Sequence, residues 1–260
     1  MQQRDERHTT TPGPALRAVG LSKQADRRPV LCDIDITVVG GEVHGVAGEH
    51  RAGSMLVRLL TGAEQADTGR IEVAGVALDP ADPEQAQRAG VWAVAEQTHL
   101  APEQTVEAVL GAGSGPGRLV ETSRRSRDAG AFLRGLGVGH LEPGSPVGLL
   151  SRGDQRLVEV ARAAYQRAVV VVLDHPETGL EEREVDLLHQ VLGRLVARGT
   201  ALLYVTSSAR DVFDICDSLT LLVPERAGGA ASVHLDRLVP PREDTVASWP
   251  AAAFVRSGSA

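Results

Sequence analysis

Apolar and polar residues alternate along the first part of the chain in the way that a half-buried strand requires. The stretch 31–48, LCDIDITVVGGEVHGVAG, follows this period of two and is divided by Gly40 and Gly41, which predicts two strands joined by a turn. In the stretch 54–62, SMLVRLLTG, the apolar positions have helical spacing, and Gly62 is typical of a helix end. The pattern therefore predicts a strand, a glycine-containing loop and a helix in succession.

The rest of the chain alternates between short predicted elements and long apolar runs. Two runs, within AVVVVLD at 168–174 and TALLYVTSS at 200–208, are typical of parallel strands buried on both faces. The other predicted elements are an antiparallel hairpin at 66–78, a short capped helix at 80–90, a buried strand at 91–96, an amphipathic helix at 151–168, helices at 181–199 and 209–217, and a strand at 218–223. Residues 103–165 are mostly helical, with a flexible loop predicted at 111–118 and a second break at 137–148.

This order of elements predicts an α/β domain of the P-loop type over residues 15–224. A helical subdomain, at about residues 100–165, is inserted between its strands. The polar residues 1–14 predict a disordered lead. Residues 225–260 are rich in Ala, Gly and Pro, which predicts an irregular C-terminal tail.

Composition narrows the class of protein only slightly. Hydrophobic residues make up 42% of the 260 residues and aromatic residues 3%, so the core is built from Val, Leu, Ala and Ile. A formal charge of −7 gives no support for nucleic-acid binding. Cys32 and Cys216 match no metal spacing and are interpreted as buried thiols in a reducing compartment. No apolar run approaches the ~18 residues of a membrane span, and the N-terminus lacks the apolar core of a signal peptide.

The loop between the predicted strand and helix has the glycine spacing of a phosphate-binding loop. Gly48 and Gly53 match the pattern G-x-x-x-x-G-K-[ST], but Ser54 stands where the pattern has lysine and Met55 where it has a hydroxyl. Such a loop binds phosphate through backbone N–H groups, the positive end of a helix and a lysine charge. Because strand–turn–helix segments with two glycines are common, this match alone leaves both a phosphate loop and an ordinary turn open.

Further motifs follow in a specific order. The segment LSRGD at 150–154 begins a helix, and Ser151 with Asp154 is typical of a helix start. The strand VVVVLD ends in Asp174, as a magnesium-holding strand does, and the turn TGLE at 178–181 comes after it. Each motif is weak alone, whereas their order and separations together are specific.

Together these segments resemble the ATP-binding subunits of ABC transporters, specifically the carbohydrate-uptake type. The resemblance covers about residues 15–224 and is carried by GEVHGVAGEHRAG, LLTGAEQADTGRIEVAG, AQRAGV, LAPEQTVEAVL, LSRGDQRLVEVARA, TGLEEREV and VFDICDSLT. It implies an ABC nucleotide-binding domain with an antiparallel β subdomain, ATP and Mg²⁺ as ligands, and ATP hydrolysis coupled to transport. The implied partners are membrane permease subunits and a second cassette. Carbohydrate-type subunits usually carry two cassettes in tandem, and this chain has one.

The resemblance assigns roles to individual positions, many of which have changed. Nucleotide-binding positions fall on Gly48, Arg51, Ala52, Gly53, Ser54 and Met55, on Asp174, which would also hold the metal, and, across the dimer, on Ser151 and Gly153. The catalytic positions fall on Glu96, where the family has glutamine, on His175, where it has glutamate, and on Ser207, where it has histidine. The adenine-stacking ring falls at about Ala25, the closing glutamine of the signature on Asp154, and the D-loop aspartate on Glu181.

These changes predict weak nucleotide binding. A lysine near phosphate contributes at most about 4 kcal/mol at an effective dielectric of about 20, and a base–aromatic stack about 1–3 kcal/mol. Losing several such contributions takes a micromolar affinity towards millimolar. Arg51 is either a replacement phosphate contact or a solvated side chain. His175 is either a replacement base or a polar residue at a strand end.

The resulting hypothesis is a cassette that hydrolyses ATP poorly or not at all and supports an intact partner. Its Ser151 and Gly153 would complete the partner's ATP site. Such a subunit would be cytoplasmic and peripheral at the inner face of the cell membrane. Two alternatives remain open at this stage, namely an ABC ATPase with altered catalytic residues and a regulatory or scaffold module that uses the same fold without a transporter.

Overall fold

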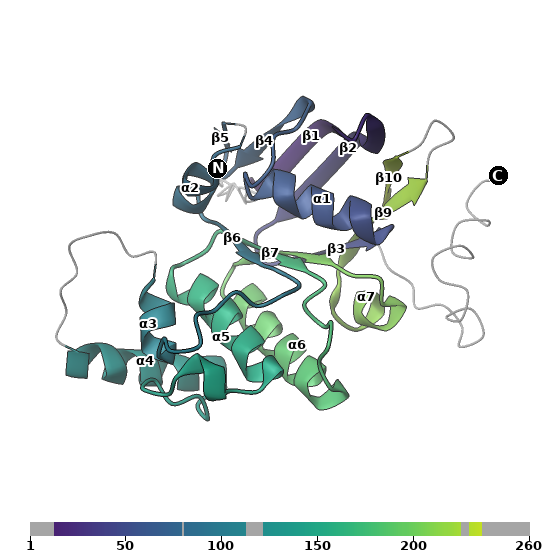
Figure 1. The fold of residues 1–260 in the computed structure, drawn as a ribbon. Coiled ribbons are helices and arrows are strands. Elements are labelled where there is room, and N and C mark those ends of the chain that lie inside the picture. The colour runs from purple at the N-terminus through teal and green to yellow at the C-terminus, as the bar shows by residue number, and fades with distance from the viewer. Residues whose placement is uncertain (1–12, 80, 113–121, 225–228, 236–260) are drawn as a thin grey trace, which may run out of the picture.

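A single mixed β-sheet runs through the protein in the computed structural model, which describes residues 13–79, 81–112, 122–224 and 229–235 (Figure 1). The strand order is β5-β4-β1-β2-β10-β9-β3-β8-β7-β6. The strands are β1 (Pro14–Ala25), β2 (Arg28–Val39), β3 (Val43–Gly48), β4 (Thr68–Val73), β5 (Val76–Ala77), β6 (Val91–Val94), β7 (Val170–Asp174), β8 (Ala201–Val205), β9 (Ser218–Pro224) and β10 (Ala230–Leu235). The helices are α1 (His50–Leu60), α2 (Pro83–Arg88), α3 (Val106–Gly111), α4 (Thr122–Leu136), α5 (Arg152–Tyr165), α6 (Glu182–Val196) and α7 (Ala209–Ile215), with a 3₁₀ turn at Val147–Leu149.

The central strands are parallel, and this arrangement positions the site. Strand β3 pairs in parallel with β8 and β9, and β7 pairs in parallel with β8 and β6. The carboxyl ends of β3 and β7 therefore lie at the same edge of the sheet. Gly48 and Asp174, the last residues of these strands, are brought to that edge although they lie far apart in sequence.

Alternate side chains of the central strands enter two different cores, as expected for strands buried on both faces. Helix α1 packs on one face, where Val170 and Val172 of β7 join Leu56. Helices α5 and α6 pack on the other, where Val171 and Leu173 belong to the second core. Figure 1 shows α1 on one side of the sheet and α5 and α6 on the opposite side. The predicted buried strands and the layered α/β architecture are confirmed.

The antiparallel part of the sheet contains one predicted hairpin and one that the sequence pattern missed. Strands β4 and β5 form the antiparallel hairpin predicted at 66–78. The pairing of β1 with β2 was not predicted, because its tight turn is made by Asp26 and Arg27 at φ 53° and 62° rather than by glycine. Gly40 and Gly41 do connect two strands, but β2 lies beside β1 and β10 and not beside β3.

The C-terminal tail predicted to be irregular contains a strand. Ala230–Leu235 forms β10, which pairs antiparallel with β9 over six residues and meets β2 at Ala230. Apolar and polar residues alternate only weakly in AASVHL. This segment forms a strand because it pairs with the edge of β9, and not because of its own pattern. Residues 1–12, most of the loop predicted at 111–118, and residues 236–260 lie outside the described part of the chain. Within the described ranges, no helix has the length and hydrophobicity needed to cross a membrane.

Candidate functional site

The loop that joins β3 to α1 keeps the backbone shape of a phosphate loop. Gly48 adopts φ 144°, and a Cβ there would lie 2.3 Å from the carbonyl oxygen of Leu222. Gly53 lies in the first turns of α1, where a Cβ would lie 2.7 Å from Cγ1 of Val205. Both glycines are therefore required by packing against the sheet, whatever the loop binds. The N-terminus of α1 is directed at the same edge of the sheet, with Glu49 as an N-cap residue that makes no side-chain cap.

Asp174 is held by this chain's own side chains. The Ser54 hydroxyl donates a hydrogen bond of 3.1 Å to Oδ1 of Asp174. The Nδ1 atom of His175 lies 2.9 Å from the same oxygen. His50 continues the cluster, with its Nδ1 3.2 Å from Nε2 of His175 and its Nε2 3.4 Å from a carboxylate oxygen of Glu96. The sequence-predicted residues Ser54, Glu96, Asp174 and His175 are thus brought together, and His50 was missed.

The contacts of this cluster engage both ring nitrogens of His175. Its Nδ1 faces Asp174 and its Nε2 faces His50. Burial lowers the pKa of His175, but the hydrogen bond and charge of Asp174, with the charges of Glu177 and Glu96, outweigh it, so the pKa is raised above the ordinary histidine value. Asp174 thus favours the protonated form of the His175 ring that lies beside it.

The remaining loop residues supply little charge to the site. Arg51 is exposed, and its guanidinium lies 3.9 Å from exposed Asp26, so it is a solvated side chain in this structure. Ala52 is buried. Met55 packs against the apolar core under α1, where a metal-binding hydroxyl would have faced the loop. Ala25, at the adenine-stacking position, also packs against this core and provides no ring.

Ser207, at the switch position, is exposed, and the groups below it form a buried polar network. Thr206 donates through its hydroxyl to Glu177, and the Tyr204 hydroxyl lies 3.3 Å from the other oxygen of the same carboxylate. The backbone N–H of Ser208 donates 2.9 Å to the Thr206 hydroxyl oxygen. Burial raises the pKa of Glu177, although the Thr206 hydrogen bond opposes this. Glu177 was missed, and the only sequence signal was a carboxylate three residues beyond Asp174 in the turn HPET.

The start of α5 keeps the predicted signature residues. Ser151 is the N-cap of α5, and its Oγ accepts a 3.1 Å hydrogen bond from the N–H of Asp154. The Asp154 carboxylate lies 2.8 Å from Nε2 of His140. The Ser151 hydroxyl also donates 3.0 Å to Glu184, and the N–H of Gly153 donates 3.2 Å to the same oxygen. Glu181 and Glu184 form a capping box at the start of α6, so the D-loop position has a structural role here.

A cleft of about 400 Å³ connects the signature helix to the Q-loop position. It is lined by Glu96, Gln97, Thr98, Arg152, Gln155, Arg156, Thr178, Gly179 and Leu180. Buried Arg156 closes its floor by donating to the carbonyl oxygens of Ala95 and Glu96 and to Glu159 at 3.1 Å. The Q-loop position, the first turn of α5 and the turn at Thr178–Leu180 therefore lie around one cleft, whereas the phosphate loop and Asp174 are not among its lining residues.

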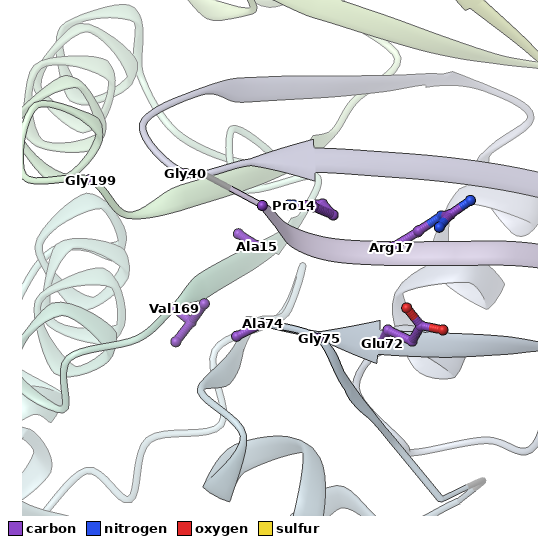
Figure 2. Close-up of a pocket in the computed structure, with 10 residues that line it drawn as sticks. Pro14, Ala15, Arg17, Gly40, Glu72, Ala74, Gly75, Val169 and Gly199 are labelled. Atoms are coloured by element: carbon purple, nitrogen blue, oxygen red, sulfur yellow. The ribbon is translucent and has the colours of Figure 1, made fainter. Parts of the chain in front are cut away.

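A second hollow lies at the opposite edge of the sheet and belongs to a different region. Figure 2 shows it between the first residues of β1, the β4–β5 turn and the segments that lead into β3, β7 and β8. Its volume is about 680 Å³, and among its lining residues only Arg17 and Glu72 are charged. These two face each other in the β1–β4 register. The larger hollow is thus remote from every predicted site residue.

The residues around Asp174 do not fit a magnesium ion. Mg²⁺ prefers carboxylate and water oxygens in octahedral geometry, whereas Oδ1 of Asp174 already accepts from Ser54 and faces an imidazole. Within the part of the chain that the structure describes, no group of three or more His, Cys, Asp or Glu residues could hold a metal ion. The phosphate loop fits phosphate by backbone shape alone, because no lysine accompanies it.

Fold and site together define a P-loop NTPase-type cassette, and comparisons with known proteins agree. The ABC transporter family matches residues 31–178. The ribose import ATP-binding protein RbsA of Chromobacterium violaceum is 34% identical over 206 residues, covering 78% of this chain and 41% of the relative. The arabinose import ATP-binding protein AraG of Rhizobium meliloti is 36% identical over 220 residues, covering 84% and 42%.

Solved structures show the same fold at lower identity. An ATP-binding cassette of an ABC transporter in its ADP conformation superimposes with a TM-score of 0.74 at 21% identity, covering 95% of this chain and 99% of that one. A nucleotide-free cassette gives 0.72 at 22% identity, covering 95% and 100%. The chain belongs to the ABC transporter family of ATP-binding proteins, as its motifs predicted. It spans about half the length of the curated relatives it matches, from 41% to 48%.

Proposed function

We propose that this chain is an ATP-binding-cassette subunit of a carbohydrate-type importer that binds ATP weakly, hydrolyses it poorly or not at all, and supports an intact partner cassette. The family generally binds ATP with Mg²⁺, and the relatives named above are sugar-import ATP-binding proteins. The proposed partners are a membrane permease and a second cassette. Its proposed location is the cytoplasmic face of the membrane, reached through the permease.

The observation that carries the proposal is the internally satisfied Asp174. Its Oδ1 receives the Ser54 hydroxyl at 3.1 Å and faces the His175 ring at 2.9 Å, so this oxygen is already engaged by side chains of the same chain. A nucleotide–metal complex would have to displace these contacts without help from a lysine. That requirement lowers affinity beyond the loss of the lysine contact itself.

The alternative of an ATPase with altered chemistry would need His175 as the base. A general base must accept a proton from water beside the γ-phosphate. Both ring nitrogens of His175 are already engaged, one by Asp174 and one by His50, and the ring is buried. Ser207 is exposed and carries no imidazole. The geometry therefore supports a poor hydrolase.

The proposal is tested by measuring ATP turnover by the purified chain at millimolar Mg²⁺. We expect no turnover above that of an Asp174→Ala variant. Calorimetric titration of ATP, with and without Mg²⁺, should give weak binding with little dependence on the metal. Magnesium-dependent turnover that Asp174→Ala abolishes would contradict the proposal and favour the altered-chemistry ATPase.

The partner role needs a separate measurement. Co-purification from the native membrane should recover a permease and a cassette with an intact phosphate-loop lysine. Recovery of neither would favour the scaffold alternative over the transporter subunit.

A further inference from the structure

Glu184 occupies the donors that the proposed function assigns to the partner's nucleotide. One carboxylate oxygen, Oε1, accepts both the Ser151 hydroxyl at 3.0 Å and the Gly153 N–H at 3.2 Å. The other oxygen accepts the Glu181 N–H at 3.0 Å. Three donors from two elements, the start of α5 and the start of α6, thus converge on one carboxylate.

The contact satisfies both signature donors completely. A hydroxyl and a backbone amide each carry one hydrogen, and both hydrogens are directed at Glu184. The Ser151 oxygen meanwhile accepts from Asp154, so the hydroxyl already has a donor and an acceptor within the chain. Neither Ser151 nor Gly153 can donate to a phosphate while Glu184 keeps its place.

Gly153 is explained by this contact as well. A Cβ at that position would lie 2.5 Å from both Cδ and Oε1 of Glu184. A glycine is therefore needed for the carboxylate to approach the amide, independently of any nucleotide. The hydrogen bonds from Glu181, Ser151 and Gly153 also keep the pKa of Glu184 below its ordinary value, so the carboxylate is charged at neutral pH.

We propose that Glu184 is an autoinhibitory latch on the signature donors. It holds Ser151 and Gly153 in the closed state and must release them before they can bind a phosphate group of the partner's nucleotide. This inference rests on the proposed function and names its regulation. The Glu184 carboxylate and a phosphate group are both anionic acceptors at the positive end of α5. They therefore compete directly for the same two donors.

The latch predicts that weakening Glu184 strengthens phosphate binding at Gly153. The experiment is an NMR titration of the ¹⁵N-labelled full chain with inorganic phosphate, which follows the Gly153 amide. Glu184→Gln keeps the shape but removes the charge, so the half-saturating phosphate concentration should fall about fivefold, since charge-assisted hydrogen bonds are roughly twice as strong as neutral ones. Glu184→Asp keeps the charge but shortens the reach of the carboxylate, so it should also lower the half-saturating phosphate concentration. It is the second variant to use where Glu184→Gln folds poorly.

Glu182→Gln is the matched control. Glu182 lies in the same helical turn, accepts from Arg210 at 2.6 Å and makes no hydrogen bond or ion pair with α5 within the described residues. Its half-saturation should equal that of the wild type. A purely structural role for Glu184 would lower stability without changing the phosphate response. An unchanged half-saturation in Glu184→Gln, or no phosphate response in either protein, would overturn the latch.

This titration contains neither nucleotide nor partner, so it separates the latch from the proposed function. Magnesium-dependent turnover would overturn the weak-ATPase assignment and leave the Gly153 result standing. An absent phosphate response would overturn the latch and leave the ATP measurements unaffected.

Discussion

The phosphate-loop end and the signature end of the candidate site differ from the family pattern in different ways. At the loop end the backbone keeps its curve, but the lysine and the metal-binding hydroxyl are replaced by Ser54 and Met55. At the signature end the donors Ser151 and Gly153 are both present, but Glu184 occupies them. Under the proposed function, tight binding at the loop end would require new side chains, whereas binding at the signature end would require only the release of the Glu184 contact. This difference is why we place the retained role at the signature end.

The largest effect should come from the backbone of the loop. Gly48→Ala places a Cβ 2.3 Å from the Leu222 carbonyl oxygen at φ 144°, so the free energy of unfolding should fall by about 3 kcal/mol or more. Urea unfolding measures this. Gly144→Ala is the matched control, because its Cβ would meet nothing within 4 Å, and it should change stability by less than about 0.5 kcal/mol. A stable Gly48→Ala protein would show that the loop end does not depend on its shape.

Restoring the lost side chains tests whether that shape still binds phosphate. The double variant Ser54→Lys, Met55→Thr should raise ATP affinity about 10-fold to 100-fold, because the lysine supplies a charge and Asp174 loses the Ser54 hydrogen bond. Calorimetry with and without Mg²⁺ measures the change. Met55→Thr alone is the control and should recover little, since the cation is still missing. If the double variant gains nothing, the curved backbone is not a phosphate loop in function.

The sequence predicted the local structure around the candidate residues better than their contacts. Period and motif order placed Gly48 and Asp174 at strand ends and Ser151 at a helix start, because strand alternation and turn residues determine where these elements begin and end. The sequence could not show the hydrogen bond between Ser54 and Asp174, because these residues are 120 positions apart. Their contact depends on the order of the strands, in which β8 lies between β3 and β7.

Residues outside any motif were missed for a related reason. His50 lies inside the phosphate-loop segment but at a position where the pattern allows any residue, so it carried no signal. Glu184 lies in the helix predicted at 181–199 and was assigned no role, because nothing in the sequence shows that its carboxylate accepts from Ser151 at the start of another helix. Strand β10 was missed because its pairing is set by β9, and not by its own weak alternation.

Two carboxylates near the site, Glu177 and Glu184, should make contributions to stability that depend on pH with opposite sign. Glu177, below the switch position, has a raised pKa, so the folded state binds more protons than the unfolded state between the ordinary glutamate pKa and the raised value. Its contribution to stability therefore falls as pH rises through that window. Glu184 has a lowered pKa, so its contribution is present above the ordinary value and is lost as pH falls through the folded value.

Paired variants isolate these two contributions. In urea unfolding between about pH 3 and pH 8, Glu177→Gln should gain stability relative to the wild type as pH rises, and Glu184→Gln should lose stability relative to it. The Glu177 effect should be the larger, because burial is the main cause of its raised pKa, whereas hydrogen bonds at a helix start lower the pKa of Glu184. Slopes of the same sign for the two variants would contradict the assigned pKa directions and the comparison built on them.

The smallest expected effect concerns the His140–Asp154 pair beside the signature donors. His140 is half exposed and lies 2.8 Å from Asp154, so His140→Ala should lower the free energy of unfolding by less than about 1 kcal/mol. Ser151→Ala removes the cap of α5 and should cost about 1 kcal/mol or more by the same urea measurement. A larger loss of stability in His140→Ala than in Ser151→Ala would mean that the His140–Asp154 contact, and not the Ser151 cap, stabilises the start of α5. Glu184 could then release Ser151 without destabilising the helix.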